Sequence, residues 1–217
     1  MNIRTIPAGP FATNAYLISE NGRCVVVDVP PGSDAELLPI IRREGLALDA
    51  ILITHGHWDH NGGVAALLAG TRADVPVFAH EDGRAFHENP EKFAPWYRSA
   101  IPGLTAADFP AFALSRPTAD GETFPLLGAD WRALAVPGHC PGSLAFYCAA
   151  EKCVFTGDAL FAGSVGRTDL PGGSFAVLEK NIREKLFTLP RDVRVFPGHG
   201  PETSVGDEIE TNPYVRP

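Results

Sequence analysis

The sequence predicts one mixed α/β domain, an α+β four-layer αββα sandwich in which two β-sheets face each other and helices cover both outer surfaces. Strand-like segments in residues 13–29 are followed by alternating helices and strands, and a similar order returns after residue 131. Elements in this order pack with sheets inside and helices outside. A chain of 217 residues with 45% hydrophobic residues is also long enough to bury such a core as a single domain, residues 1–217.

The first half begins with a predicted β-hairpin whose turn contains Asn21-Gly22, a pair typical of two-residue hairpin turns. A helix follows, which Ser33 or Asp34 can cap and Gly45 can end. The expected elements of this half are strands 13–19 and 23–29, a helix from 33 or 34 to about 44, strand 50–54, a helix from about 62 to 69, and strand 75–79.

The second half is predicted to contain strands 131–136, 143–149 and 152–156, followed by a glycine-rich loop and a helix from about 174 to 186. A further apolar run, 193–196, and one short helix complete the chain. The predicted buried stripe of the 174–186 helix consists of Phe175, Leu178, Ile182 and Leu186.

Residues 84–118 are the least regular part, because aromatic residues alternate there with prolines. Two interpretations stay open. This insertion either packs its aromatic side chains onto the core, or forms a lid that supplies substrate contacts, as long ordered loops often do.

Histidines and aspartates follow four of the predicted strands. His55, His57, Asp59 and His60 come directly after strand 50–54, and glycine-containing breaks place one more candidate ligand after each of three later apolar runs. Residues i and i+2 of an extended segment point the same way, so His55 and His57 can share one ion while Asp59 and His60 reach a second. Four strand ends meeting at one edge would gather donors for two metal ions. The later candidates are His139, Asp158 and His199.

The composition excludes several function classes. A net charge of −8 argues against a nucleic-acid partner, which would require a basic face. The N-terminus lacks the apolar segment of a signal peptide, and no apolar run approaches the ~20 residues of a membrane span, so we expect a cytoplasmic protein with no membrane partner. The four cysteines show no CxxC spacing and are expected to be buried thiols; Cys140, beside His139, is interpreted as a bystander.

The stretch Thr54-His55-Gly56-His57-Trp58-Asp59-His60, with the later His and Asp residues, resembles the metallo-β-lactamase superfamily over nearly the whole chain. The short, single-domain bacterial glyoxalase II-like hydrolases are most similar, because of Gly166-Arg167-Thr168-Asp169 after Asp158 and the segment 197–203. The resemblance implies two divalent metal ions, zinc first and iron or manganese as alternatives, with Asp59 and Asp158 as catalytic residues. It implies that His55, His57 and His139 bind one ion, that Asp59, His60 and His199 bind the other, and that Asp158 bridges them.

The expected reaction is attack of a metal-activated hydroxide on an acyl carbon. A thioester fits better than an amide, because a thiolate leaves without a strong general acid and no spare acid is identifiable. The partner would thus be a small-molecule thioester, similar to S-lactoylglutathione, or a related ester. Arg167 is the candidate substrate-binding residue, with a salt bridge to Asp169 as the alternative.

The same residues leave three other functions to consider. A persulfide dioxygenase of the same superfamily would use one iron, here on His55, His139 and Asp158. A binding module without activity is disfavoured by the complete ligand set, and a nuclease by the acidic charge balance. His80 is expected to be a structural residue, and His87 receives no role.

Overall fold

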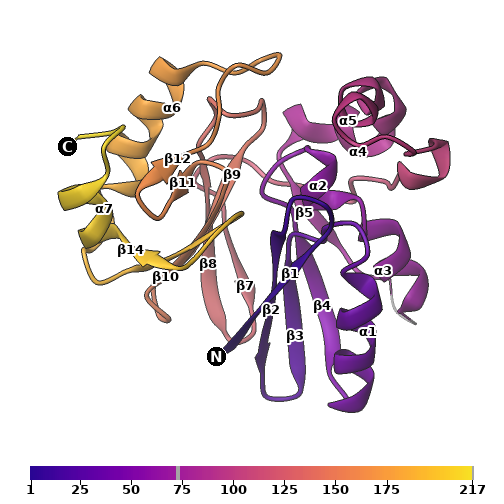
Figure 1. Cartoon of the computed structure of the whole chain (residues 1–217). Coiled ribbons are helices and arrows are strands. Elements are labelled where there is room, and N and C mark those ends of the chain that lie inside the picture. Colours follow the sequence, from indigo (N-terminus) through magenta and orange to yellow (C-terminus); the bar gives the residue numbers. More distant parts are fainter. Residues whose placement is uncertain (72–73, 217) are drawn as a thin grey trace.

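Two six-stranded β-sheets face each other in the computed structural model, and helices cover the outer face of each (Figure 1). The structure describes residues 1–71 and 74–216. The predicted four-layer αββα sandwich is therefore confirmed. In spatial order, the first sheet consists of β1 (Asn2–Ala8), β2 (Thr13–Glu20), β3 (Arg23–Val27), β4 (Ala47–Leu52), β5 (Val77–Ala79) and β6 (Arg116–Pro117). The second consists of β14 (Thr203–Ser204), β13 (Arg194–Pro197), β10 (Cys153–Gly157), β9 (Leu144–Cys148), β8 (Ala129–Ala135) and β7 (Thr123–Leu126).

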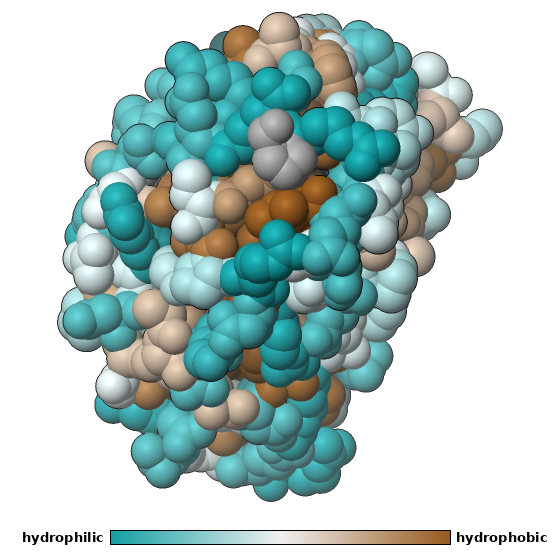
Figure 2. Space-filling model, turned by 90° about the vertical axis from the view of Figure 1, so that its left-hand side faces the viewer, coloured by the Kyte–Doolittle hydropathy of each residue, from teal (hydrophilic) through white to brown (hydrophobic). Residues whose placement is uncertain are grey.

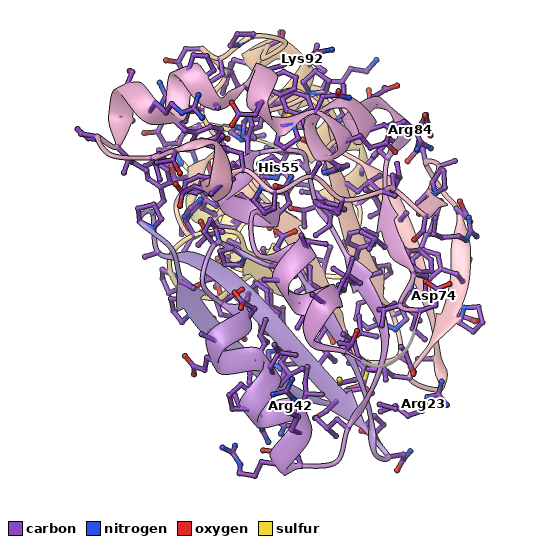
Figure 3. The ribbon with its side chains drawn as sticks, turned by 90° about the vertical axis from the view of Figure 1, so that its right-hand side faces the viewer. Arg23, Arg42, His55, Asp74, Arg84 and Lys92 are labelled. Atoms are coloured by element: carbon purple, nitrogen blue, oxygen red, sulfur yellow. The ribbon has the colours of Figure 1, made fainter. Side chains whose placement is uncertain are left out.

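A two-stranded ribbon, β11 (Leu160–Phe161) and β12 (Ser164–Val165), lies in the loop after β10. Helices α1 and α3 lie over the first sheet, which Figure 3 views from their side. Figure 2 views the opposite side, that of α6 and α7, where hydrophilic residues surround smaller apolar areas. No helix in the described ranges has the length and apolar character needed to cross a bilayer. The helices are α1 (Asp34–Arg43), α2 (Trp58–Asn61), α3 (Val64–Gly70), α4 (Arg84–Glu88), α5 (Ala94–Ala100), α6 (Phe175–Asn181) and α7 (Val205–Thr211).

Strand direction explains why the candidate ligands can meet. In the first sheet β3, β4 and β5 are parallel, so their carboxyl ends lie at one edge. In the second sheet β10 is parallel to β13, and β8 runs the same way because each is antiparallel to β9. The loops that follow β4, β8, β10 and β13 carry the candidate ligands. Both sheets therefore deliver polar side chains at the ends of strands, as parallel strands in α/β proteins commonly do.

The space between the sheets is filled by aromatic side chains. Phe155 stacks on Phe196 with ring centroids 4.9 Å apart, and the edge of Tyr16 meets Phe155 at 5.1 Å. Trp131 also stacks on Phe155, at 5.8 Å. Two further apolar clusters lie outside the sheets, one under α1 and α3 and the other under α6 and α7. The sheets are thereby fixed relative to each other close to their ligand-bearing ends.

Several predicted boundaries were wrong for local reasons. The second hairpin strand ends at Val27, because Asp28 has a φ of +53° and so leaves the extended conformation. The helix predicted for 174–186 is α-helical only to Asn181 and continues as a π-helical turn. Phe175 is 40% exposed and does not belong to the buried stripe, since it stands at the first helical residue, outside the cluster beneath.

Other expectations were met, and some strands were missed. The Asn21-Gly22 turn has φ of +49° and +76°, as its hairpin type requires. Ser33 precedes α1 as predicted, but its hydroxyl donates to the carbonyl of Pro30 and does not cap the helix. Strand 75–79 is shorter than predicted, at Val77–Ala79. The missed strands β1, β6, β7, β11, β12 and β14 are mostly short or at sheet edges, where pairing rather than sequence pattern defines them.

The insertion 84–118 contains α4, α5 and three-residue helical turns rather than a sheet layer. Ala94, Tyr97 and Phe109 pack with Trp58 in a small buried cluster beside the histidine loop. The Trp58 indole N–H donates to the carbonyl of Asp108 at 2.6 Å. The segment therefore packs part of its aromatic content onto the body of the molecule, next to the strand ends.

We expect Phe155→Ala to lower the free energy of unfolding by ~3–5 kcal/mol, because it opens a cavity among the stacked rings between the sheets. Phe175→Ala is the matched control: its ring is 40% exposed, and its loss should cost less than ~0.5 kcal/mol. Guanidinium unfolding of both variants at equal metal content measures the difference. Similar losses in the two variants would contradict the assigned core.

Candidate metal centre

The structure brings all seven predicted side chains together at the edge where the strands end. His55 and His57 lie in the loop after β4, Asp59 and His60 on α2, and the remaining three follow β8, β10 and β13. Their donor atoms form three overlapping groups, each with all atoms within 4.8 Å of one another. The groups are His55, His57 and His139; His55, His60 and Asp158; and Asp59, His60 and His199.

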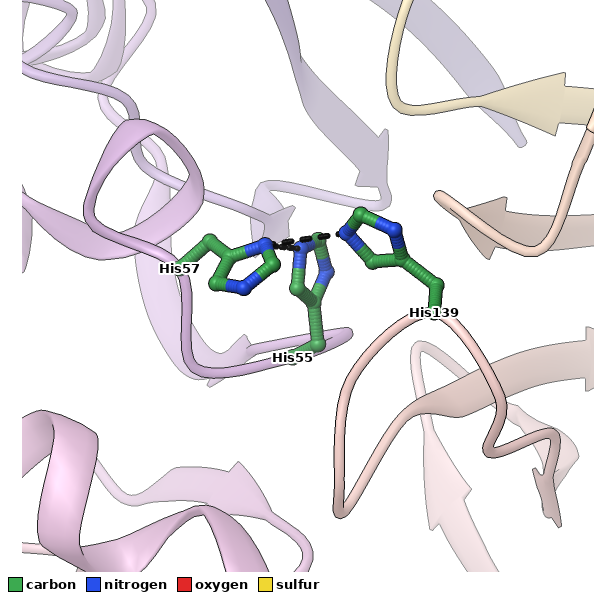
Figure 4. Close-up of side chains that lie close together, drawn as sticks. All are labelled: His55, His57 and His139. Atoms are coloured by element: carbon green, nitrogen blue, oxygen red, sulfur yellow. Dashed lines mark hydrogen bonds between the residues drawn. The ribbon is translucent and has the colours of Figure 1, made fainter. Parts of the chain in front are cut away.

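The first group consists of three imidazoles from two loops (Figure 4). His57 Nδ1 lies 3.1 Å from His55 Nε2 and 2.9 Å from His139 Nε2. Ligands at the usual zinc–nitrogen distance of ~2.0–2.1 Å are separated by roughly 3.3 Å around a tetrahedral ion. The three nitrogens therefore converge as one face of such a site would require.

The third group, Asp59, His60 and His199, also lies close to Asp158. His60 Nε2 is 3.6 Å from Asp59 Oδ2, and His199 Nε2 is 3.4 Å from the same oxygen. Asp158 Oδ1 lies 3.2 Å from His60 Nε2, and its Oδ2 lies 3.5 Å from both His139 Nε2 and His199 Nε2. This carboxylate thus faces both groups, which is the position that a bridging ligand needs.

Within the described residues, two buried atoms of this set make no hydrogen bond of good geometry, namely His60 Nε2 and Asp158 Oδ1, which face each other at 3.2 Å. A buried polar atom without a partner costs free energy, so such atoms are rare unless a ligand or ion completes them. Nitrogen and carboxylate oxygen are the donors that zinc and iron prefer. The donor types, their spacing and these two buried atoms all fit divalent cations.

Burial and mutual charge set the protonation of the centre. Burial is the main cause that lowers the pKa of His55 well below its usual value and that of His57 to about 3, so both rings are neutral, the form that binds metal. Burial opposes the ionisation of Asp158, yet the facing His60 and His199 outweigh it and lower the pKa of this carboxyl. The same two imidazoles lower the pKa of Asp59.

The pKa values of His60 and His199 shift in the opposite direction, upwards. Burial alone would lower the pKa of each ring, but Asp158 and Asp59 raise that of His60 well above its usual value and that of His199 to about 9. Without a cation, protons on these two rings therefore compensate the buried carboxylates. A cation bound among the same atoms would take over that role and release the protons.

The second ring nitrogens of His55, His139 and His199 are each held by a different part of the chain. His55 Nδ1 contacts Thr54 Oγ1 at 3.1 Å, and His139 Nδ1 contacts the carbonyl of Arg167 at 2.7 Å. The carbonyl of Phe11 lies 3.2 Å from His199 Nδ1. Such contacts fix the orientation and tautomer of a metal-binding imidazole.

A fourth ring, that of His60, is anchored by Asp28, a residue that the sequence did not mark as part of the metal centre. Its carboxylate lies 2.7 Å from His60 Nδ1 and accepts hydrogen bonds from both Thr54 N and Thr54 Oγ1, at 2.8 and 2.7 Å. Asp28 follows β3 directly, so it occupies the same strand-end position as the ligands themselves. That position was the available signal for a role at the centre.

Two glycines permit the close approach of the strand ends. A Cβ on Gly198 would lie 2.3 Å from Asp158 Oδ1 and 2.5 Å from His60 Cε1. A Cβ on Gly157, whose φ is +50°, would lie 2.4 Å from Thr54 Oγ1. Any side chain at either position would push the donors apart.

Asn14 and Tyr16 of the first sheet bind the backbone on either side of His199. Asn14 Nδ2 donates to the carbonyls of Pro197 and Gly200, each at 3.0 Å, and the Tyr16 hydroxyl donates to Pro197 at 2.6 Å. These bonds connect the first sheet to the last ligand-bearing loop. The position of His199 therefore depends on a strand near the N-terminus.

The side chain of Arg167 lies at the centre's cavity and pairs with Asp169 through two contacts of 2.7 Å. The salt bridge is thus present, and substrate binding by Arg167 stays a prediction. What the sequence did not indicate is that the Arg167 carbonyl orients His139.

The other predicted bystanders lie outside the donor groups. His80 Nδ1 accepts from Asp82 N at 3.2 Å, in keeping with a structural role. His87 is buried in α4 and contacts Asn61 Nδ2 at 3.1 Å. Cys140 is buried, which raises the pKa of its thiol to about 12 and makes it a poor nucleophile. All four cysteines are free and buried.

Comparison with known proteins agrees with this geometry. The family model of the metallo-beta-lactamase superfamily matches residues 8–199. Hydroxyacylglutathione hydrolase GloC of Haemophilus influenzae is 35% identical over 216 residues, which cover 99% of this chain and 98% of that protein. The crystal structure of the BLEG-1 B3 metallo-beta-lactamase is 33% identical with a TM-score of 0.88, and covers 99% of both chains.

The crystal structure of TTHA1623 in a di-iron-bound form is 38% identical with a TM-score of 0.82, covering 98% of this chain and all of that one. A two-ion centre is thus known in a protein similar to this chain. From the family match, the full-length identity and the shared fold, we conclude that this chain belongs to the metallo-beta-lactamase superfamily.

Proposed function

We propose that this metallo-hydrolase cleaves a small-molecule thioester at a two-ion centre, as hydroxyacylglutathione hydrolases do. The observation that carries the proposal is the complete set of seven donors at one edge, with Asp158 facing both groups of imidazoles. The 35% identity to GloC over the full chain supports a thioester as substrate. Related acyl esters belong to the same reaction class.

We propose the same ligand assignment that the resemblance implies, with zinc as the metal and iron or manganese as alternatives. When bound, two such ions lower the pKa of a shared water and polarise the acyl carbonyl. The proposed ligands of the two ions are His55, His57 and His139 for the first and Asp59, His60 and His199 for the second, with Asp158 shared.

The chain's own residues prepare the centre for this reaction. Burial keeps His55 and His57 neutral, while Asp59 and Asp158 stay ionised, so these four donors already have the protonation state that binds cations. A thiolate leaving group departs without a general acid, since thiols have a pKa of ~8.5. The cavity at the centre, ≈ 270 Å³, has room for a small substrate rather than a polymer.

The location and partners follow from the same chemistry. A reaction that releases a thiol, together with four free cysteines, suits a reducing compartment, and we propose the cytoplasm. The net charge of −8 supports a small molecule rather than a nucleic acid as the partner.

The second candidate function is a dioxygenase with one iron on His55, His139 and Asp158. The additional group of donors formed by Asp59, His60 and His199 favours two ions over one. The two functions therefore differ in a quantity that can be measured directly, the number of metal ions per chain.

We expect the reconstituted protein to hold two divalent ions per chain, and chelation to abolish thioester hydrolysis until the ions are restored. Elemental analysis by mass spectrometry and an assay with S-lactoylglutathione measure the two quantities. One iron per chain with oxygen uptake on glutathione persulfide would instead establish the dioxygenase.

His57→Ala should lower kcat/KM for S-lactoylglutathione by at least ~100-fold, more than the ~10–100-fold typical when only a residue behind a ligand is lost. His80→Ala is the control, because His80 is also a strand-end histidine but its ring accepts a hydrogen bond from Asp82 N and lies outside the donor groups. Circular dichroism checks that both variants are folded. Full turnover by His57→Ala would refute the ligand assignment.

Asp28→Asn should weaken metal binding by ~10–100-fold, because the uncharged amide holds His60 Nδ1 less firmly than the carboxylate does. Competition with a chromogenic chelator measures the affinity. Asp192→Asn, which removes an exposed carboxylate paired with Lys152, should leave the affinity unchanged. Equal affinities in the two variants would show that Asp28 does not support the centre.

A further inference from the structure

A second cavity lies directly beside the metal centre. It has a volume of ≈ 280 Å³ and is lined mainly by aromatic side chains and prolines. The insertion contributes one wall, in which Phe86 and Phe93 stack with ring centroids 3.9 Å apart. Leu170 and Pro171 of the glycine-rich loop contribute the opposite wall. We call this space the side cavity.

The side cavity is continuous with the centre in its lining. His57, Trp96, Tyr97 and Leu170 line both this cavity and the ≈ 270 Å³ cavity that contains the donors. The ring centroids of Phe86 and His57 lie 6.1 Å apart, with the rings nearly perpendicular. The apolar wall therefore begins beside a candidate metal ligand. A molecule whose reacting carbon lies at the donors can therefore extend one substituent into the side cavity.

The charged groups near the side cavity stand at its two ends, one exposed to solvent and one beside the metal centre. Lys92 lines it but is exposed, and Figure 3 places it at the outer end of the molecule, away from His55. On the side of the metal centre, the guanidinium of Arg167 lies 5.7 Å from the Trp96 ring. The Tyr97 hydroxyl already accepts a hydrogen bond from Trp58 N at 2.9 Å. The walls between these groups are apolar.

These walls discriminate between the two parts of a thioester. A hydroxylated or charged group placed against Phe86 and Phe93 would lose its water without gaining hydrogen-bond partners. An apolar group would gain from leaving water, and more so with each methylene. The polar thiol carrier therefore belongs on the Arg167 side of the centre, which leaves the side cavity to the acyl group.

We propose that the side cavity binds the acyl group of the substrate, and that the preferred acyl group is apolar, a medium-length aliphatic or arylalkanoyl group rather than a short hydroxylated one. The inference rests on the proposed thioester hydrolysis and deepens it by naming the substrate class. Residues Phe86, Phe93 and Trp96 of the insertion are then the specificity-determining residues.

The test uses the full-length, metal-reconstituted protein and glutathione thioesters that share one thiol but differ in the acyl group: acetyl, lactoyl, hexanoyl and phenylacetyl. A buried methylene is worth a factor of ~4, so the four additional methylenes of hexanoyl should raise kcat/KM at least ~20-fold over acetyl. Lactoyl should be no better than acetyl. Equal kcat/KM for all four would overturn the inference while thioester hydrolysis itself stood.

The Phe93→Ser variant tests whether the side cavity causes the preference for apolar acyl groups, because Phe93 lines the side cavity but not the cavity of the donors. The ratio of hexanoyl to acetyl kcat/KM should fall at least ~10-fold. Each buried methylene raises kcat/KM by ~4-fold, and the variant should lose most of that gain. This ratio does not depend on the fraction of folded protein. Tyr214→Ala, which removes an aromatic ring that is 54% exposed, should keep the ratio of the unmodified chain. A ratio that survives Phe93→Ser would overturn the assignment to the side cavity.

Binding of S-alkylglutathione thioethers, which lack a scissile carbonyl, separates this inference from the proposed function. Calorimetry should show that S-hexylglutathione binds more tightly than S-methylglutathione, and that Phe93→Ser removes the difference. Tighter S-hexyl binding without turnover of any thioester would overturn the proposed function and support the side cavity as an apolar binding site. Equal binding of the two thioethers would overturn the inference whether or not thioesters are hydrolysed.

Discussion

Two ionised carboxylates, the buried Asp59 and the largely buried Asp158, lie at the edge of a β-sandwich, and the local structure compensates for their removal from water. An isolated buried charge is too costly for a folded protein to keep, so it must be paired or neutralised. Imidazoles surround both groups, and in the absence of a cation His60 and His199 carry protons for that purpose. Metal binding at this edge is therefore an exchange of protons for divalent cations, and its affinity must depend on pH.

That exchange works only if the donors hold their positions without the ions. The donors stand at the ends of strands rather than on long side loops, and the rings are oriented from behind by Asp28, Thr54 and the carbonyls of Phe11 and Arg167. Tyr16 of the first sheet packs against Phe155 and Phe196 of the second, which helps to hold the two sets of strand ends together. The donors of a centre supported in this way move little when they bind ions, which is the general requirement for precise metal sites.

In the proposed function, the donors at the strand ends carry out the reaction and the insertion selects the substrate. The strand ends supply the donors, whereas the insertion supplies an apolar cavity that opens on His57. The helical part of the insertion lies outside the sheets, so its side chains can change without disturbing the strand register or the donors. The resemblance to glyoxalase II-like hydrolases describes the centre and does not by itself determine what enters the side cavity.

The sequence by itself determined the layer architecture and the identity of the seven donors, because both depend on local patterns. Apolar runs that end in glycine and histidine or aspartate mark strands and their ends whatever surrounds them. Strand pairing, by contrast, is a long-range property, so edge strands such as β1 and β14 carried no clear local signal. The exposure of Phe175, the anchoring of His60 by Asp28 and the apolar side cavity likewise arise from segments far apart in the chain. Only the tertiary structure could decide these, because they depend on which side chains meet across sheets and loops, and spacing along one segment does not encode that.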